Sequence, residues 1–151
     1  SILLIIGDGP EKDRIEALAK QLGISDEIRL LGRVSDEEKF QYLAVSDVYL
    51  STAIHEGFGI VFLEAMECGL PVLSYDRGGQ TDFLREGKTG YLIELGNKGN
   101  FVSKLKELLN STSLRREIGA HNKNYVKEFY IEHVAEKYIS IFNEVASSHK
   151  S

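Results

Sequence analysis

The stretch "HEGFGIVFLEAMECGLPVLSY", residues 55–75, is the most informative part of the sequence about the fold, because it predicts a loop, a helix and a strand in immediate succession. Two glycines open it, the apolar residues that follow predict a buried helix over about 59–68, and the run 70–75 has the composition of a covered strand. Three glutamates nevertheless stand inside it, at Glu56, Glu64 and Glu67. Because a buried carboxylate loses its hydration, acids in such a segment need partners or a function.

The segments on either side of this stretch repeat the order of strand, turn and helix. Strands are expected at 2–7, 27–32, 47–52, 70–75 and 89–95. Helices are expected at 10–23, 35–46, 59–68, 98–110, 112–128 and 131–147, with a loop and a short helix at 78–87. Ser35 followed by Glu38 has the pattern of a capping box, in which each side chain binds the backbone amide of the other residue.

This alternation of strands and helices indicates an α/β domain. We expect a doubly wound, Rossmann-like parallel sheet of about five strands, with helices on both faces and extra helices at the C-terminus. No internal repeat or clear interdomain linker interrupts residues 1–151, so one domain is expected. The chain enters the apolar run "ILLIIG" at residue 2, which suggests a fragment of a longer protein.

Composition narrows the classes of function. With 151 residues, 42% of them hydrophobic, the chain is long enough to bury a full core. The net charge of −5 argues against a general nucleic-acid-binding role, because such proteins need a basic surface. The single cysteine, Cys68, suits a reducing compartment, and no apolar run approaches the roughly 20 residues that span a bilayer. A cytoplasmic protein is therefore expected.

Doubly wound sheets bind ligands where strands end and the following helices begin. Gly57 and Gly59 stand at such a point, so the amides beside them are expected to approach a ligand, at a helix N-terminus that favours an anion. Glu56 and Glu64 would lie about 80° apart around a helix of about 3.6 residues per turn, stacked along it and not paired for acid–base exchange. Carboxylates accept hydrogen bonds from hydroxyls, so a sugar nucleotide fits this arrangement.

Here the sequence resembles a known family. The segment "EGFGIVFLE", Glu56 to Glu64, resembles the Glu-x7-Glu motif of family four of the retaining glycosyltransferases, which have the GT-B fold. Four further segments resemble the C-terminal, donor-binding domain of that family, in its order and approximate spacing: "LLIIGDGPEKDRIEALAKQLGI", "IRLLGRVSDEE", "LEAMECGLPVL" and "GGQTDFLREGKTGYLI". The resemblance covers about residues 2–145, although Tyr130-Ile131 replaces the Ser-Trp pair that often precedes the last helix.

The resemblance implies a role for each matching position. Glu56 would accept hydrogen bonds from hydroxyls of the transferred sugar, and Glu64 would hold the ribose hydroxyls. The backbone amides that would contact the sugar and the neighbouring phosphate belong to Phe58, Gly59 and Ile60. Val34 would contact the base through its backbone, and "GGQTD" would line the cleft by weaker analogy.

The resemblance also implies what lies outside this chain. Such enzymes hold the diphosphate with an Arg and Lys pair early in the C-terminal domain, and their acceptor site belongs to an N-terminal domain. We therefore expect the first strand and helix of this domain to precede the sequence, and the isolated fragment to bind donor weakly and to be inactive. The expected donor is a UDP-sugar, with GDP-mannose next, and the acceptor a glycan or lipid carrier. No metal or other cofactor is expected, and the full-length enzyme would be cytoplasmic or at the inner face of the membrane.

Two other readings stay open at this point. The chain could be a non-catalytic, flavodoxin-like module that binds a nucleotide or a protein partner, in which case Glu56 would be dispensable. A two-domain epimerase of the same overall fold fits the Glu-x7-Glu spacing less well. For single residues, Glu67 is expected at the surface, His55 is expected to be a loop residue and not a general base, and Gly78-Gly79 fits a turn or a ligand contact equally well.

Overall fold

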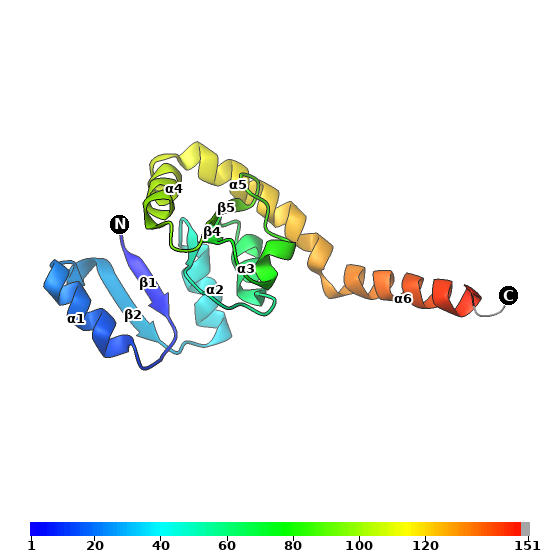
Figure 1. Ribbon diagram of the computed structural model, residues 1–151, viewed down its shortest axis with the longest axis horizontal. Coiled ribbons are helices and arrows are strands. Elements are labelled where there is room, and N and C mark those ends of the chain that lie inside the picture. Colours follow the sequence, from blue (N-terminus) through cyan, green and yellow to red (C-terminus); the bar gives the residue numbers. More distant parts are fainter. Residues whose placement is uncertain (149–151) are drawn as a thin grey trace. The chain divides into compact units, whose positions relative to one another are not determined.

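The computed structural model describes residues 1–148, which fall into two compact units (Figure 1). The first unit covers residues 1–44 and the second begins at residue 45. The elements alternate in the predicted order, and every predicted helix and strand is present with bounds that differ by a few residues. The local patterns of apolar spacing and capping therefore determine the elements in both units.

The first unit contains two strands and two helices, joined in part by a short 3₁₀ helix. Its elements are β1 (Leu3–Ile6), α1 (Lys12–Leu22), η1 (Ser25–Glu27), β2 (Ile28–Gly32) and α2 (Asp36–Ala44). The two strands pair in parallel, with Leu3 opposite Ile28. Gly23 ends α1 in the left-handed conformation, φ 69°, which a residue without a side chain adopts at little cost.

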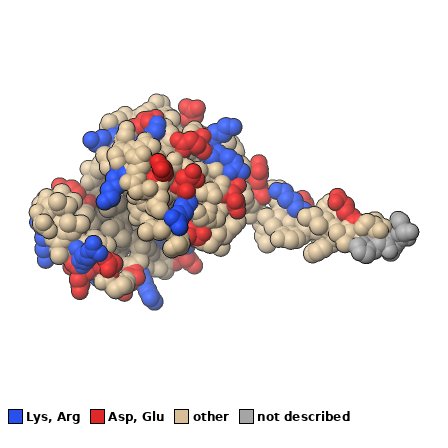
Figure 2. Space-filling view, in the orientation of Figure 1, with Lys and Arg blue, Asp and Glu red and all other residues tan. Residues whose placement is uncertain are grey.

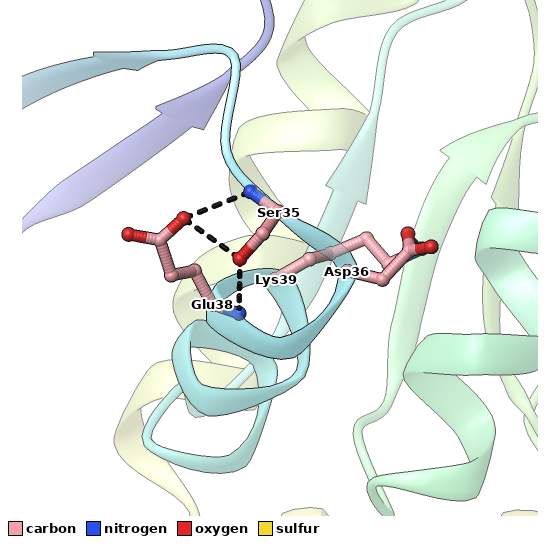
Figure 3. A network of polar contacts seen from close by, with 4 residues as sticks. All are labelled: Ser35, Asp36, Glu38 and Lys39. Carbon is pink, nitrogen blue, oxygen red and sulfur yellow. Dashed lines mark hydrogen bonds and ion pairs between the residues drawn. The ribbon is translucent and has the colours of Figure 1, made fainter.

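The predicted capping box begins α2 (Figure 3). The Glu38 amide donates to Ser35 Oγ at 3.2 Å, while Glu38 Oε2 accepts from both the Ser35 amide and the Ser35 hydroxyl at 2.8 Å. These bonds, first from the amide and then from the hydroxyl, lower the pKa of Glu38. Lys39 pairs with Asp36 at 3.0 Å on the same turn.

The second unit contains a sheet in the order β3-β4-β5, with both strand pairs parallel. Its strands are β3 (Tyr49–Ser51), β4 (Val72–Tyr75) and β5 (Gly90–Ile93). Its helices are α3 (Ile60–Glu67), η2 (Gly79–Asp82), α4 (Lys98–Asn110), α5 (Thr112–Tyr125), η3 (Val126–Phe129) and α6 (Ile131–Ser148).

Neighbouring residues of β4 belong to different hydrophobic clusters. Val72 lies in a cluster with Phe62 of α3 and Val126 of η3, whereas Leu73 lies in a cluster with side chains of α4 and α5. Successive side chains of a strand point to opposite faces of the sheet. Both faces of this sheet are therefore covered by helices, as predicted for a doubly wound arrangement.

The five described strands belong to a two-stranded sheet, β1-β2, in the first unit and a three-stranded sheet, β3-β4-β5, in the second. The run that forms β1 was also predicted to be covered on both faces, yet Leu3 is 42% and Ile6 38% exposed. The α/β class and the parallel pairing of the strands are confirmed.

The last helix, α6, has no buried residue. Figure 2 shows mostly uncharged surface along this helix. The exposed large apolar side chains of α6 are Ile131, Tyr138, Ile139, Ile141, Phe142 and Val145. The hydroxyl of Tyr130, just before α6, donates to Glu67 Oε2 at 2.7 Å, which ties this region to α3. Over residues 1–148, no helix combines the length and apolar character needed to cross a bilayer.

Candidate functional site

The candidate site is built on the loop between β3 and α3 and on the first turn of α3. Gly59 precedes the helix in the left-handed conformation, φ 90°, and no side chain of residues 1–148 caps the helix N-terminus. Only the Phe62 amide is bonded back to Gly59, at 3.0 Å to its carbonyl oxygen. The first amides of a helix have no partner within the helix, and their combined dipole favours a negative charge. This end of α3 can therefore bind an anion.

The two glycines of the loop have different tasks. A Cβ at Gly57 would meet nothing within 4 Å, so the missing side chain leaves open space beside the backbone. A Cβ at Gly59 would lie 2.6 Å from the Phe62 ring and 3.2 Å from Glu56 Cγ. The conformation of Gly59 and its packing against Phe62 therefore require a glycine there, and the roles of both glycines toward a ligand stay predictions.

The carboxylates of Glu56 and Glu64 both act on the phenol of Tyr49, the first residue of β3. Burial raises the pKa of Tyr49 to about 12, and the negative charges of Glu56 and then Glu64 add to the effect. The Tyr49 ring packs edge-on against Phe62 at 5.4 Å between centroids. Both glutamates are half-buried, and Glu64 Oε2 is fully buried. The structure therefore brings the two predicted acids into one environment.

Sequence reasoning missed Tyr49. It stands in a short apolar strand, several residues before the motif that drew attention. A tyrosine in such a strand commonly packs in a hydrophobic core, and the neighbouring residues in the sequence do not indicate any other role for it. Only the packing of β3 beside α3 brings its hydroxyl under the influence of two acids.

The turn after β4 packs against the loop that carries Glu56. The Gly79 amide donates to the Glu56 carbonyl oxygen at 2.9 Å, and a Cβ at Gly79 would overlap the carbonyl oxygen of Gly57. A Cβ at Gly78 would lie 3.1 Å from Glu56 Cβ. The close approach at Gly78-Gly79 is therefore made to the loop that holds Glu56, as a packed turn requires, and a ligand contact of these glycines stays a prediction.

The other predicted residues are placed as follows. Phe58 is half exposed, and the centroid of its ring lies 5.4 Å from that of Phe83. The Ile60 side chain is exposed. Val34 is half-buried in the loop between β2 and α2 of the first unit. His55 and Glu67 are exposed, as expected. The roles assigned to Val34, Phe58 and Ile60 toward a ligand stay predictions.

Metal binding was predicted to be absent. Within residues 1–148, no group of three or more His, Cys, Asp or Glu side chains is arranged to hold a metal ion. Cys68 is half-buried, and burial followed by the charge of Glu67 raises its thiol pKa. A raised pKa keeps a thiol protonated and unreactive, so Cys68 offers no nucleophile to the site.

Comparison with known proteins gives a consistent family. A family model described as glycosyl transferases group 1 matches residues 1–125. The chain is 35% identical over 150 residues to N-acetyl-alpha-D-glucosaminyl L-malate synthase of Bacillus anthracis, covering 99% of this chain and 39% of that protein. The chain thus spans well under half the length of this relative.

Solved structures give the same result. A mutant of S. aureus TarM, in complex with Fondaparinux, alpha-GlcNAc-glycerol and UDP, matches with a TM-score of 0.83 and 28% identity. That match covers 94% of this chain and 29% of TarM. The pneumococcal O-GlcNAc transferase GtfA, in complex with UDP and GlcNAc, matches with a TM-score of 0.79 and 27% identity, covering 96% of this chain and 29% of GtfA.

Proposed function

The chain belongs to the glycosyl transferases group 1, and from this premise we propose that it binds a nucleoside-diphosphate sugar, a UDP-sugar being the favoured donor. The sugar would be transferred to a glycan or a lipid-linked acceptor, with the anomeric configuration retained. One observation carries the proposal: the half-buried residues Glu56, before α3, and Glu64, within α3, lie on either side of a helix N-terminus that no side chain of the described residues caps.

Each part of the site would recognise one part of the donor. Glu56 would accept hydrogen bonds from hydroxyls of the sugar, since an ionised carboxylate offers only acceptors. The amides from Phe58 to Ile60 would bind the phosphate at the start of α3, where unpaired N–H groups and the helix dipole both favour negative charge. Glu64 would accept from the ribose hydroxyls, and the backbone of Val34 would contact the base.

The chemical step requires more than these residues. As the donor bond breaks, negative charge develops on the departing diphosphate, and cationic groups lower the free energy of that transition state. We propose that an upstream basic pair supplies this charge, and that an N-terminal domain binds the acceptor. The partial coverage of the relatives supports this division of labour. UDP in the complexes of TarM and GtfA supports the choice of nucleotide. Neither a metal nor another cofactor is part of the proposal, and the full-length enzyme is proposed to act in the cytoplasm or at the inner face of the membrane.

Nuclear magnetic resonance titration of the chain with UDP and with UDP-GlcNAc tests the donor site. Glu64→Ala should weaken binding of both ligands about tenfold, the value of a hydrogen bond to a charged group. Glu56→Ala should weaken UDP-GlcNAc by a similar factor and leave UDP unchanged. Glu67→Ala is the matched control, because it removes an exposed carboxylate from the same helix.

Two results would contradict the proposal. The first is that the amide resonances of residues 57–64 do not shift with either ligand. The second is that both site variants bind the ligands with the affinity of the wild type. Either result would favour the alternative of a non-catalytic nucleotide- or partner-binding module.

A further inference from the structure

One fully buried polar side chain beside the site has no role in the proposed function. Gln80, in the first turn of η2, is 0% exposed. Its Nε2 donates to three acceptors at the end of β4 and in the turn that follows: the Arg77 carbonyl at 2.7 Å, the Tyr75 carbonyl at 3.2 Å and Ser74 Oγ at 3.4 Å. A single side-chain amide thus links the end of β4 to the turn that contacts the Glu56 loop.

The amide orientation follows from these partners. The two carbonyl oxygens can only accept, so the NH₂ group of Gln80 must face them. Its Oε1 is then directed toward Gly78, where it would lie 2.7 Å from a Cβ. Oε1 is buried and has no hydrogen-bond partner among the described residues, which is unfavourable because the atom loses its hydration without compensation. The fold tolerates this cost at a position where an apolar side chain would avoid it.

The turn that Gln80 shapes is in direct contact with the donor loop. Gly79 donates to the Glu56 carbonyl and has no room for a side chain against Gly57. The Thr81 hydroxyl donates to the Gly78 carbonyl oxygen at 2.8 Å. A shift of this turn by a few tenths of an ångström would therefore move the backbone that carries the Glu56 carboxylate.

We propose that Gln80 is a positioning residue of the donor site, which holds the Gly78-Gly79 turn so that Glu56 is presented to the hydroxyls of the donor sugar. The proposal rests on the proposed function, since it assigns Gln80 to the sugar-binding part of that site. It acts on Glu56 and leaves the ribose contact of Glu64 unaffected. Gln80 therefore governs the preference for a nucleotide sugar over the bare nucleotide.

Asn122 supplies the matched control. It is also a fully buried amide, whose Nδ2 donates to the Leu70 carbonyl at 2.7 Å and the Thr89 carbonyl at 2.9 Å, and its Oδ1 also has no partner. Leu70 and Thr89 precede β4 and β5, so these bonds lie at the end of the sheet away from the Glu56 loop. Loss of either amide removes comparable hydrogen bonds, but only one of them supports the site.

The test compares Gln80→Met with Asn122→Leu, each an apolar side chain of similar size. In the ligand-free chain, Gln80→Met should shift the amide resonances of residues 56–59, and Asn122→Leu should not. In titrations, Gln80→Met should reduce the affinity for UDP-GlcNAc about tenfold relative to that for UDP. Asn122→Leu should keep the wild-type ratio of the two affinities, although thermal unfolding should show a similar loss of stability.

Wild-type resonances at 56–59 together with a wild-type affinity ratio in Gln80→Met would overturn the positioning role. Failure of the wild type to bind either ligand would overturn the proposed function instead, and the ligand-free spectra would still decide whether Gln80 positions the loop. If Gln80→Met does not fold, Thr81→Val takes its place, because it loosens the same turn from a less buried position. It should change the ratio about threefold in the same direction, less than a full buried bond; no change would overturn the proposal.

Discussion

Different interactions stabilise the interior of each of the two units. In the second unit, two clusters of buried side chains cover both faces of the sheet. In the first unit, the buried hydrophobic residues are only Ala19 and Leu43 of those described, while Leu3 and Ile6 of β1 remain exposed. The first unit relies on backbone pairing and helix caps, which contribute about 1 kcal/mol each.

This difference in core packing bears on where a functional site can form. A binding site needs side chains held within a fraction of an ångström, which packing and second-layer hydrogen bonds provide. Glu56, Glu64 and Tyr49 all belong to the unit with the closed core. Four measurements test this contrast between the two units.

The largest effect is expected from a core truncation in the second unit. Phe62 is 0% exposed and contacts both Tyr49 and the Gly59 backbone, so Phe62→Ala should lower the free energy of unfolding by about 3–5 kcal/mol. The matched change in the first unit, Phe40→Ala, removes a ring that is 39% exposed and should cost about 1 kcal/mol. Urea denaturation with amide hydrogen exchange in each unit measures both, and equal losses would contradict the contrast.

The second effect appears at alkaline pH, in the second unit. Burial, with the charges of Glu56 and Glu64, raises the pKa of Tyr49 to about 12 from 10.0. The folded chain holds this proton more tightly than the unfolded chain, so the contribution to stability is complete below pH 10 and is lost as the pH rises toward 12. The loss should be roughly 2 kcal/mol.

Tyr49→Phe isolates this contribution, because it keeps the ring packing and removes the ionisable hydroxyl. Denaturation curves across the alkaline range should show a steeper loss of stability in the wild type than in the variant. Parallel curves would mean that the Tyr49 hydroxyl is not held away from solvent. Glu56→Gln should lower the Tyr49 pKa, since it removes one of the two charges.

A smaller effect is expected from the helix cap of the first unit. Ser35→Ala removes the side-chain acceptor of the Glu38 amide and should cost about 1 kcal/mol, measured by hydrogen exchange in α2. Ser111 caps α5 in the second unit through one bond of 3.3 Å to the Leu114 amide. Ser111→Ala should leave α2 untouched, whereas increased exchange in both helices would show that the two units unfold together.

The smallest effect is expected at acidic pH, in the first unit. Hydrogen bonds from the Ser35 amide and then its hydroxyl lower the pKa of Glu38. The contribution to stability is therefore present above the ordinary carboxyl pKa and is lost as the pH falls through the lowered value. Ser35→Ala should raise the Glu38 pKa only part of the way, because the backbone amide remains; a complete return to the ordinary value in a carboxyl titration would contradict this order of causes.

The elements of both units follow from the sequence because they depend on neighbours within a few residues. Apolar spacing predicted the helices and strands, Gly23 predicted the end of α1, and Ser35 with Glu38 predicted the start of α2. The Glu-x7-Glu spacing also singled out Glu56 and Glu64, whose proposed contacts with a donor stay predictions. All of these signals are local, so the sequence alone contains them.

Contacts between distant segments were decided by the tertiary structure. The sequence could not show that the strands pair as two sheets, that Gly59 is required by Phe62, or that Tyr49 lies in the field of two acids. Nor could it separate Gln80, which supports the site, from Asn122, which ties the opposite end of the sheet. Both are buried amides in a polar stretch of sequence, and only the position of their partners in space gives one of them a place beside Glu56.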